Sequence, residues 1–353
     1  MVQRVCLVSG GSGGHLLPAL SLARALRATG RDAMLVTEGR EAERALLVGS
    51  GIEAREVAVG GGVVMPFRLA RAVLQARRVL RDEGVDLVVG TGGRASVPVA
   101  LAARTLGIRV CLMEQNAVPG RANRLLAHLA SRIWLGLPTT RPLPRAVVTG
   151  TPLRHGLGVP ERARARAELG LDRERPVLLV FGGSQGAAVL NETVPAALAT
   201  IQTPVQVVHL TGAGRDEPVR RAYAEARGDI RALVRPLAND MATLYAAADL
   251  VICRGGGSTI AELMAVGRGA LIVPYPFHRD RHQWHNGKVL ERAGAAVVVE
   301  QTRFDAATLT GILIRLLGTP AELRTMGERA RGLVPGDACT TILEDLVRLE
   351  TTS

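Results

Sequence analysis

Three glycine-rich segments hold most of the groups that are suited to binding or catalysis. The first, GGSGG at 10–14, follows a short apolar run and is followed at once by His15. The second, GGSQG at 182–186, and the third, GGG at 255–257, each follow another apolar run. Glycine leaves backbone N–H groups uncovered at a helix start, where the helix dipole favours anions, so these segments are predicted to bind phosphates. A tight strand-to-helix turn needs the same small residues, so one loop alone does not identify a ligand.

The standard nucleotide-binding motifs are absent from these loops. A dinucleotide motif needs a third glycine where Leu16 stands, and a Walker A loop needs a lysine beside the glycines. Lys288 is the only lysine of the chain and lies far from all three loops in the sequence. The loops therefore predict an anion site of another kind.

The third segment carries several polar neighbours. Arg254 precedes its glycines and is expected either to reach a phosphate or to be a surface cation. Ser258 or Thr259 is expected to cap the helix that follows. Glu262, one turn into that helix, is placed to accept hydrogen bonds from a ribose diol; its alternative role is a favourable charge near a helix N-terminus.

Two residues are candidates for a general base, His15 and Glu114. An imidazole exchanges a proton near neutral pH, and a helix N-terminus favours its neutral form. Glu114 lies at the predicted carboxyl end of a strand, where ligand-binding residues of α/β sheets collect. The alternatives are structural, since His15 would also pack the helix start and Glu114 would also hold a loop. We favour His15 as the base.

The elements that position these residues alternate between strands and helices, which predicts parallel sheets with helices on both faces. The expected strands of the first half are Val5–Ser9, Ala33–Val36, Arg55–Val59, Asp86–Gly90, Arg109–Met113, Ile133–Gly136 and Ala146–Thr149. Those of the second half are Val177–Phe181, Val205–Leu210, Ile230–Val234, Leu250–Cys253, Ala270–Val273 and Ala295–Val299.

The two halves also resemble each other. LVSGGSGGHLLPAL in the first half has a counterpart in LVFGGSQGAAVLNETVPAAL in the second. This duplication predicts an α/β fold with two Rossmann-like domains in tandem and a ligand-binding cleft between them. We expect domains at 1–157 and 158–335, a linker near 154–160, and a final helix at 336–353.

Composition limits the remaining classes of function. The chain has 353 residues and a net charge of +12, and 3% of its residues are aromatic. The positive charge favours polyanionic partners, but dispersed arginines with few aromatic rings to stack bases argue against nucleic acid. The four cysteines form no CxxC or Cys/His cluster, which argues against disulfides and zinc. No segment reads as a signal peptide or a transmembrane span, so we expect a soluble cytoplasmic protein.

Over nearly its whole length the chain resembles the MurG family of bacterial N-acetylglucosaminyltransferases. The matching segments are GGSGGHLLPAL, EQNAVPGRANR, GTPLR, GGSQGAAVLN, CRGGGSTIAELMAVGRGALIVPYP and DRHQWHNGKVLERAGAA, in that order. The EQN…NR segment is highly specific in combination with GGSQGA…N and the final HQ…N. The family transfers GlcNAc from UDP-GlcNAc to undecaprenyl-diphosphate-MurNAc-pentapeptide, which converts lipid I to lipid II in peptidoglycan synthesis. The resemblance implies a GT-B fold, an inverting hexosyltransferase, a first domain for the lipid acceptor and a second domain for the donor. It also implies that the final helix at 336–353 packs back on the first domain.

The resemblance also implies which residues form the site. Ser184 and the loop around it would hold the donor diphosphate, Glu262 the ribose, Ala238 the uracil and Gln283 the GlcNAc hydroxyls. Together with the candidates above, the expected UDP-GlcNAc-binding set is Ser12, Gly13, Gly14, Asn116, Arg154, Ser184, Ala238, Arg254, Gly257, Ser258, Thr259, Glu262, His282 and Gln283. Further candidates are Arg94, Asn123, Gln185, Asn191 and Asn286.

Two positions depart from the family pattern. Arg94 stands where a GGY motif has tyrosine, and it would offer a charge-assisted hydrogen bond to phosphate. Met113 stands where the family's HEQN has histidine, which makes a packing role for this position the better expectation.

No D-x-D motif occurs, so we expect neither a metal nor another cofactor, and predict that loop amides, helix dipoles and Arg254 stabilise the departing diphosphate. The expected partners are UDP-GlcNAc, lipid I and the anionic inner-membrane surface, with peripheral attachment on the cytoplasmic side. In the segment from Phe67, Arg68, Arg71, Arg77, Arg78 and Arg81 would form a basic helix face above an apolar one, after an apolar loop at 63–65. An ordinary domain helix is the alternative.

Other functions compatible with these features are another GT-B nucleotide-sugar enzyme, such as a glycolipid glycosyltransferase or a sugar-nucleotide epimerase, and a non-catalytic nucleotide-sugar binding module. The EQN…NR segment argues against a glycolipid glycosyltransferase. Transfer of label from UDP-GlcNAc to a lipid acceptor would exclude the epimerase and the binding module.

Overall fold

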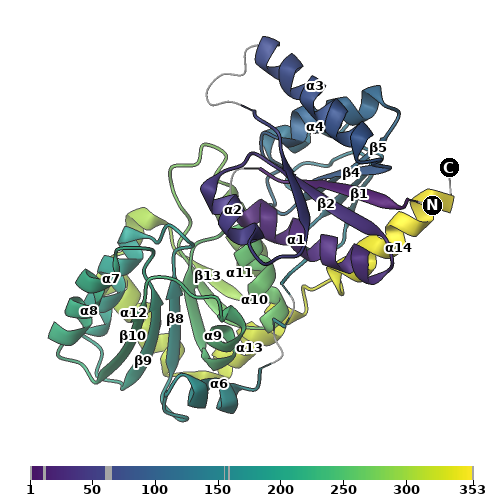
Figure 1. Ribbon diagram of the computed structural model, residues 1–353. Helices are drawn as coiled ribbons and strands as arrows, with labels where there is room; N and C mark the ends of the chain where they lie inside the picture. Colours follow the sequence, from purple (N-terminus) through teal and green to yellow (C-terminus); the bar gives the residue numbers. More distant parts are fainter. Residues whose placement is uncertain (1, 11–12, 60–65, 155, 158–159, 352–353) are drawn as a thin grey trace. The chain divides into compact units, whose positions relative to one another are not determined.

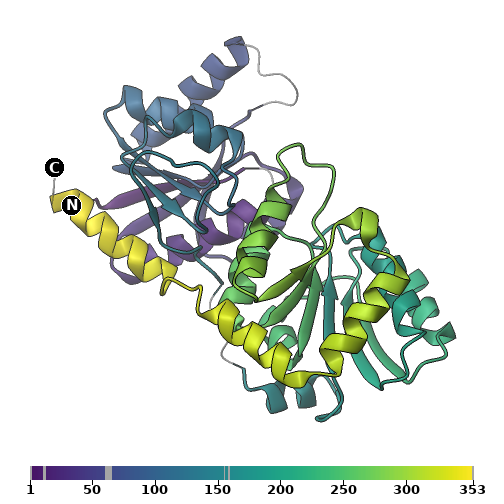
Figure 2. The same ribbon diagram turned by 180° about the vertical axis from the view of Figure 1, so that it is seen from behind.

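The computed structural model describes residues 2–10, 13–59, 66–154, 156–157 and 160–351, which form two compact units. Unit 1 consists of Met1–His155 together with Pro335–Ser353, and unit 2 consists of Gly156–Val334. Each unit is a parallel sheet with helices on both faces, which Figures 1 and 2 show from opposite sides. The predicted α/β fold with two Rossmann-like sheets is confirmed. No helix in the described ranges is long and apolar enough to cross a membrane.

The sheet of unit 1 has the strand order β3-β2-β1-β4-β5-β6-β7. Its strands are β1 (Arg4–Val8), β2 (Asp32–Thr37), β3 (Glu53–Glu56), β4 (Leu87–Gly90), β5 (Arg109–Glu114), β6 (Arg132–Leu135) and β7 (Ala146–Val148). Its helices are α1 (Gly13–Ala28), α2 (Glu41–Leu47), α3 (Pro66–Asp82), α4 (Ser96–Thr105), α5 (Arg121–Leu126) and α14 (Ala338–Thr351).

Alternation along β1 divides the core of unit 1 into two layers. Val5 and Leu7 pack with α1 and with Ile342 of α14, whereas Cys6 and Val8 pack with α3, α4 and α5. The final helix, α14, therefore covers one face of the unit 1 sheet, where Figure 1 shows it beside α1. It is also held by a hydrogen bond of 2.8 Å from the indole N–H of Trp134 to Asp345.

The sheet of unit 2 has the order β10-β9-β8-β11-β12-β13. Its strands are β8 (Val177–Phe181), β9 (Val205–Leu210), β10 (Ile230–Arg235), β11 (Leu250–Cys253), β12 (Gly269–Ile272) and β13 (Ala296–Val298). Its helices are α6 (Arg162–Glu168), α7 (Ala188–Leu198), α8 (Asp216–Glu225), α9 (Met241–Ala247), α10 (Gly257–Val266), α11 (His282–Arg292), α12 (Ala306–Leu317) and α13 (Pro320–Arg331), with a 3₁₀ turn at Gln301–Arg303.

All thirteen predicted strands are present in these two sheets. The largest shift is at β3, which was predicted at 55–59 and lies at Glu53–Glu56. Val57 and Val59, whose apolar character suggested the longer strand, are buried beyond the end of the ladder. Val57 still donates its N–H to the carbonyl oxygen of Thr37 at 2.9 Å. Buried residues just beyond a strand give the same apolar signal as the strand itself, so the pattern misplaced this boundary.

Candidate active site

The strand order reverses once in each sheet, and the glycine loops lie at these two points. In unit 1, β1 lies between β2 and β4, and the chain leaves β1 and β4 toward opposite faces of the sheet. In unit 2, β8 and β11 stand in the same relation. The carboxyl ends of such neighbouring strands form the usual ligand crevice of an open α/β sheet. Each unit therefore has a candidate site at its own switch point.

In unit 1, His15 lies in the first turn of α1 and contacts the segment after β4. Its half-buried ring packs on Gly92, where an added Cβ would approach ring atom Cε1 to 2.8 Å; with φ at +107°, this position favours glycine. The hydroxyl of Thr91 donates to the carbonyl oxygen of His15 at 3.1 Å. The β4 segment thus fixes both the backbone and the ring of His15.

The amide of Gln115 determines which nitrogen of His15 carries the proton. Gln115 donates through Nε2 to the carbonyl oxygen of Thr91 at 3.2 Å, so its Oε1 faces Nδ1 of His15, also at 3.2 Å. Because Oε1 only accepts, Nδ1 must carry the hydrogen. In the neutral ring the other nitrogen, Nε2, is then unprotonated, and it has no hydrogen-bond partner within the described ranges. This arrangement leaves His15 ready to accept a proton.

Glu114, the other candidate base, lies at the end of β5 with its carboxylate fully engaged. One oxygen accepts from the backbone N–H and the side-chain amide of Asn116, at 3.0 and 3.2 Å. The other accepts from the N–H of Gly120 at 2.8 Å and from Asn123 at 2.9 Å. Four hydrogen bonds on a side chain that is 2% exposed favour the structural alternative, in which Glu114 organises the 115–120 loop.

The remaining candidates of unit 1 have different surroundings. Arg94 forms an ion pair of 3.0 Å with Glu38, whose carboxylate is shared with Arg40. The two guanidinium groups hold the pKa of Glu38 below its usual value against the opposing effect of burial. Met113 is buried in the core beside α1, as a packing residue would be. Gly13 and Gly14 open α1, whereas Ser12 lies outside the described residues.

In unit 2, the loop at 182–186 leaves β8 and turns sharply into α7. Gly186 has φ of +68°, and a Cβ there would lie 2.0 Å from the carbonyl oxygen of Thr211, so the loop packs directly on the segment after β9. The side chains of Ser184 and Gln185 are exposed at the tip. This geometry is suited to a loop whose backbone faces a diphosphate.

A buried chain of side-chain hydrogen bonds lies behind this loop. Asn191 of α7 donates to the carbonyl oxygen of Thr211 at 3.0 Å, so its Oδ1 faces Nε2 of His209 at 3.1 Å. Nε2 must therefore carry the hydrogen, and Nδ1 accepts from the hydroxyl of Tyr223 at 2.9 Å. Burial lowers the pKa of His209 to about 3 and raises the pKa of Tyr223. Both side chains are therefore neutral near pH 7, and each keeps its role as donor or acceptor in these hydrogen bonds. Asn191, predicted as a site candidate, thus supports the loop from behind.

The third glycine segment begins α10 without the predicted cap. Gly256 is the N-cap residue, with φ and ψ of −66° and 144°, and no side chain caps the helix. The helix starts at Gly257, so Ser258 and Thr259 lie in its first turn and the capping prediction was wrong. Glu262 is 7% exposed and accepts a hydrogen bond of 2.9 Å from the hydroxyl of Tyr245.

Arg254, ahead of these glycines, is not the surface cation that was one of its two expected roles. Its guanidinium donates to the carbonyl oxygens of Val273 and Pro274 and, at 2.8 Å, to Gln301. Burial lowers the pKa of this half-buried group. These contacts direct Arg254 toward the segment after β12, which it holds in place.

Two residues of α11 contact this part of unit 2. Gln283 accepts a hydrogen bond of 2.9 Å from the N–H of Tyr275, and its backbone packs on Gly255. The amide of Asn286 is buried and donates to the carbonyl oxygen of Gly255 at 2.9 Å. The segments after β11 and β12 and the start of α11 therefore meet at one edge of the sheet.

The structure places the remaining donor candidates in three positions. His282 starts α11, where its Nδ1 lies 2.8 Å from Asp280. Ala238 lies in the loop between β10 and α9 of unit 2, and Arg154 lies after β7, at the end of the first segment of unit 1.

Sequence reasoning missed four residues with a clear structural part in these sites, namely Gln115, Thr91, His209 and Tyr245. Gln115 directly follows Glu114 at a strand end, a position that could have drawn attention to it. His209 stands inside an apolar run, where a lone histidine is unusual. No sequence signal pairs Tyr245 with Glu262.

Two Rossmann-like units, each with a glycine loop at its switch point, define a GT-B type glycosyltransferase fold. The chain belongs to glycosyltransferase family 28, since the N-terminal domain of that family matches residues 5–135 and its C-terminal domain matches residues 177–333. This membership confirms the resemblance stated from the motifs.

Individual relatives agree with the family. The chain is 42% identical to UDP-N-acetylglucosamine--N-acetylmuramyl-(pentapeptide) pyrophosphoryl-undecaprenol N-acetylglucosamine transferase of Acidithiobacillus ferrooxidans, covering 97% of this chain and 96% of the relative. It is 38% identical to the enzyme of the same name from Stutzerimonas stutzeri, covering 98% of both. The crystal structure of Acinetobacter baumannii MurG superposes with a TM-score of 0.84 at 32% identity, covering 98% and 99% of the two chains. A UDP-GlcNAc 2-epimerase from Neisseria meningitidis, at 14% identity and a TM-score of 0.69 over 98% and 100%, shares the fold alone.

Proposed function

We propose that the chain transfers N-acetylglucosamine from UDP-GlcNAc to undecaprenyl-diphosphate-MurNAc-pentapeptide, the lipid I to lipid II step of peptidoglycan synthesis. The observation that carries this proposal is the similarity over nearly the full length to transferases named for that reaction. The loops at the two switch points support it, because the reaction needs a base and a site for a diphosphate. His15 of unit 1 would serve as the base, and the loop at 182–186 of unit 2 would bind the diphosphate.

We assign the donor to unit 2 and the acceptor to unit 1. The backbone of 182–186 and the hydroxyl of Ser184 would bind the donor diphosphate, with the N-terminus of α7 behind them. Glu262, held by Tyr245, would accept from the ribose hydroxyls, and Gln283 would contact the sugar. Loop amides and helix dipoles would stabilise the leaving UDP, and the reaction would require no divalent cation.

We assign the general base to His15. Nε2 would remove the proton from the acceptor hydroxyl as its oxygen attacks the anomeric carbon of GlcNAc. The bond between that carbon and the diphosphate oxygen then breaks, UDP departs, and the anomeric centre inverts in one displacement. Gln115 would hold the ring in the productive tautomer throughout, and Glu114 would shape the adjacent loop.

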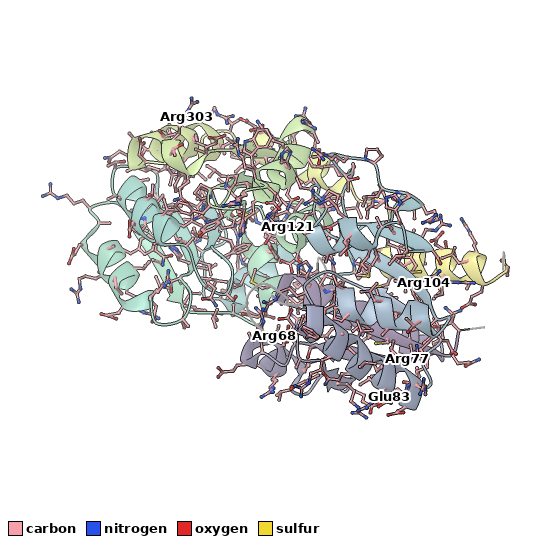
Figure 3. All side chains as sticks on the ribbon, turned by 90° about the horizontal axis from the view of Figure 1, so that it is seen from above. Arg68, Arg77, Glu83, Arg104, Arg121 and Arg303 are labelled. Atoms are coloured by element: carbon pink, nitrogen blue, oxygen red, sulfur yellow. The ribbon has the colours of Figure 1, made fainter. Side chains whose placement is uncertain are left out.

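The lipid acceptor requires work at a membrane surface, and α3 is our candidate for the contact. Arg68, Arg71 and Arg78 are exposed on this helix, while Ala72, Ala76 and Leu80 are buried, so the predicted two faces exist. Basic residues contribute about 1 kcal/mol each near an anionic surface. Figure 3 shows the positions of Arg68 and Arg77 on the helix.

Two details modify the predicted face. Arg77 donates to the carbonyl oxygen of Thr105 at 3.0 Å and is therefore engaged within unit 1. Phe67 and Leu74 are 85% and 60% exposed, which adds apolar groups to the basic face. The apolar loop at 63–65 lies outside the described residues.

One assay tests the proposed reaction. Purified protein is incubated with radiolabelled UDP-GlcNAc and a lipid I analogue in the presence of EDTA. Label in the lipid supports the proposal, whereas label only in free sugar or in an epimer contradicts it. Activity that disappears with EDTA and returns with Mg²⁺ would contradict only the metal-independent step.

A vesicle-binding assay tests the surface separately. Charge reversal at Arg68, Arg71 and Arg78 should weaken binding to anionic vesicles, while reversal of the exposed Arg303 of unit 2 should not. Equal binding of both variants would exclude α3 as the contact.

A further inference from the structure

A cavity of about 300 Å³ lies in unit 2 at the edge of the sheet opposite the glycine loops. We call it the basal cavity, and its polar lining includes Arg162, Asp249, Arg268, Arg324 and Arg331. Asp249 and Arg268 directly precede β11 and β12, whereas the glycine loops follow the ends of strands. Helices α6 and α13 supply the other three residues. The cavity is therefore separate from the candidate donor site.

The one carboxylate deep in this cavity is already saturated. Asp249 pairs with Arg162 at 2.5 Å and with the fully buried Arg166 at 2.6 Å. It also accepts the backbone N–H of Val177 at 2.8 Å. Asp249 consequently has little capacity to neutralise further guanidinium groups around the cavity.

Two of the other arginines are fixed by neutral partners. Arg268 donates to the carbonyl oxygens of Tyr245 and Ala246 at the end of α9, at 2.9 and 3.0 Å. Arg331 donates to the carbonyl oxygen of Val266 at the end of α10, at 3.1 Å. These bonds orient the two guanidinium groups without removing their charge, and neither forms an ion pair within the part of the chain that the structure describes.

The local charge is positive. Five guanidinium groups (Arg162, Arg166, Arg268, Arg324 and Arg331) gather around the cavity with three carboxylates (Glu174, Asp249 and Glu328). Burial and the neighbouring Arg162 and Arg331 lower the pKa of Arg268, the direction expected where positive charge is under-compensated. A concave site with surplus positive charge attracts anions, and guanidinium groups match phosphate oxygens in geometry.

We propose that the basal cavity is an accessory site for a small phosphate-class anion, namely inorganic phosphate, pyrophosphate or the phosphate group of a nucleotide. Its size is near the lower end for ligand pockets (about 300–1,000 Å³) and suits such an anion. The bound anion joins Arg324 and Arg331 of α13 to Arg162 of α6 and to Arg268, and so ties two helices to the start of β12. This site goes beyond the transfer reaction and does not depend on it.

The test is binding of pyrophosphate to the full chain saturated with UDP, so that the proposed donor loop is occupied. Calorimetry and thermal unfolding are carried out at constant ionic strength, with chloride replacing pyrophosphate in the reference. We expect saturable binding and an increase in Tm that chloride does not reproduce. UMP and inorganic phosphate as further probes show which source of phosphate binds most tightly.

Arg324→Gln is the informative variant, because Arg324 is exposed and forms no hydrogen bond or ion pair within the residues that the structure describes. We expect its pyrophosphate affinity to fall about tenfold, the usual loss for one charge-assisted contact. Arg303→Gln, at an exposed position after β13 (Figure 3), is the matched control and should bind as the parent does. An effect of pyrophosphate equal to that of chloride, or equal affinity of the two variants, would overturn the proposal. The transfer activity of Arg324→Gln should remain unchanged, so this outcome is read independently of the proposed function.

Discussion

Both units use the same three groups behind their glycine loops, a histidine, an amide side chain and a threonine carbonyl. In unit 1, Thr91 holds Gln115, which orients His15. In unit 2, Thr211 holds Asn191, which orients His209. Thr91 directly follows β4, the neighbour of the strand β1 that leads into the first loop. Thr211 directly follows β9, the neighbour of the strand β8 that leads into the second loop.

The two arrangements differ in which ring nitrogen is protonated and in whether the other ring nitrogen forms a hydrogen bond. His15 lies on the helix of its own loop, is half-buried and keeps Nε2 unprotonated. His209 lies inside β9, is fully buried and uses both nitrogens. The same building blocks therefore give one loop a group that can take up a proton and give the other a rigid support. We infer that the first loop acts in the chemical step and the second in holding the donor.

His15→Ala should have the largest effect of the changes that separate these roles. Loss of a general base lowers kcat by about 10²–10⁴-fold, and KM for UDP-GlcNAc should stay within a factor of about three. Steady-state kinetics with Glu114→Gln as the comparison tests this. A larger loss of kcat in Glu114→Gln would move the base to Glu114.

Asn191→Ala should show the opposite pattern. It removes the partner of the Thr211 carbonyl and of Nε2 of His209 beneath the loop, at a cost of about 1–3 kcal/mol. We therefore expect KM for UDP-GlcNAc to rise about tenfold with kcat little changed. Gln206→Ala is the matched control, because Gln206 of β9 is also an amide inside unit 2, fully buried, but it binds Asp172 instead of the segment beneath the loop. A similar increase of KM in both variants would show that only the stability of unit 2 matters.

Gln115→Leu tests the orientation of His15 without removing the imidazole. Without the acceptor at Nδ1 the tautomer is no longer selected, so kcat should fall about five- to tenfold while KM for the donor is kept. Gln115→Glu restores an acceptor and should recover part of the loss. Full activity of Gln115→Leu would show that the ring is positioned by Gly92 and Thr91 alone.

His209 should make unfolding depend on pH in a predictable direction. Its pKa is about 3 in the folded chain and about 6.5 when unfolded, so between these values the unfolded chain binds more protons. The free energy of unfolding should therefore fall as the pH decreases, by about 1 kcal/mol from pH 7 to pH 5.5. Urea unfolding of His209→Gln should lack this contribution, while exposed His128→Gln should retain it. Identical slopes for parent and His209→Gln would contradict the buried neutral state.

Sequence patterns were sufficient for the sheets and insufficient for the side-chain networks. Buried parallel strands give continuous apolar runs, and glycine loops are local signals, so both were predictable from windows of a few residues. The partnership of His15 with Gln115 joins residues far apart in sequence and depends on β4 lying between β1 and β5 in the sheet. The hydrogen bonds from Tyr245 to Glu262 and from Arg254 to Gln301 likewise join residues that lie on separate elements of unit 2. Ser258 and Thr259 were misjudged because Gly256 already has the backbone conformation of an N-cap, which lets the helix begin three residues earlier than a cap at Thr259 would require.

Long-range ¹H–¹⁵N spectra of protein labelled at histidine measure the contrast between the two units directly. We predict that His15 is the Nδ1–H tautomer and His209 the Nε2–H tautomer at neutral pH, assigned with His15→Ala and His209→Gln. An Nε2–H tautomer at His15 would leave no nitrogen free to accept the acceptor's proton and would contradict the account.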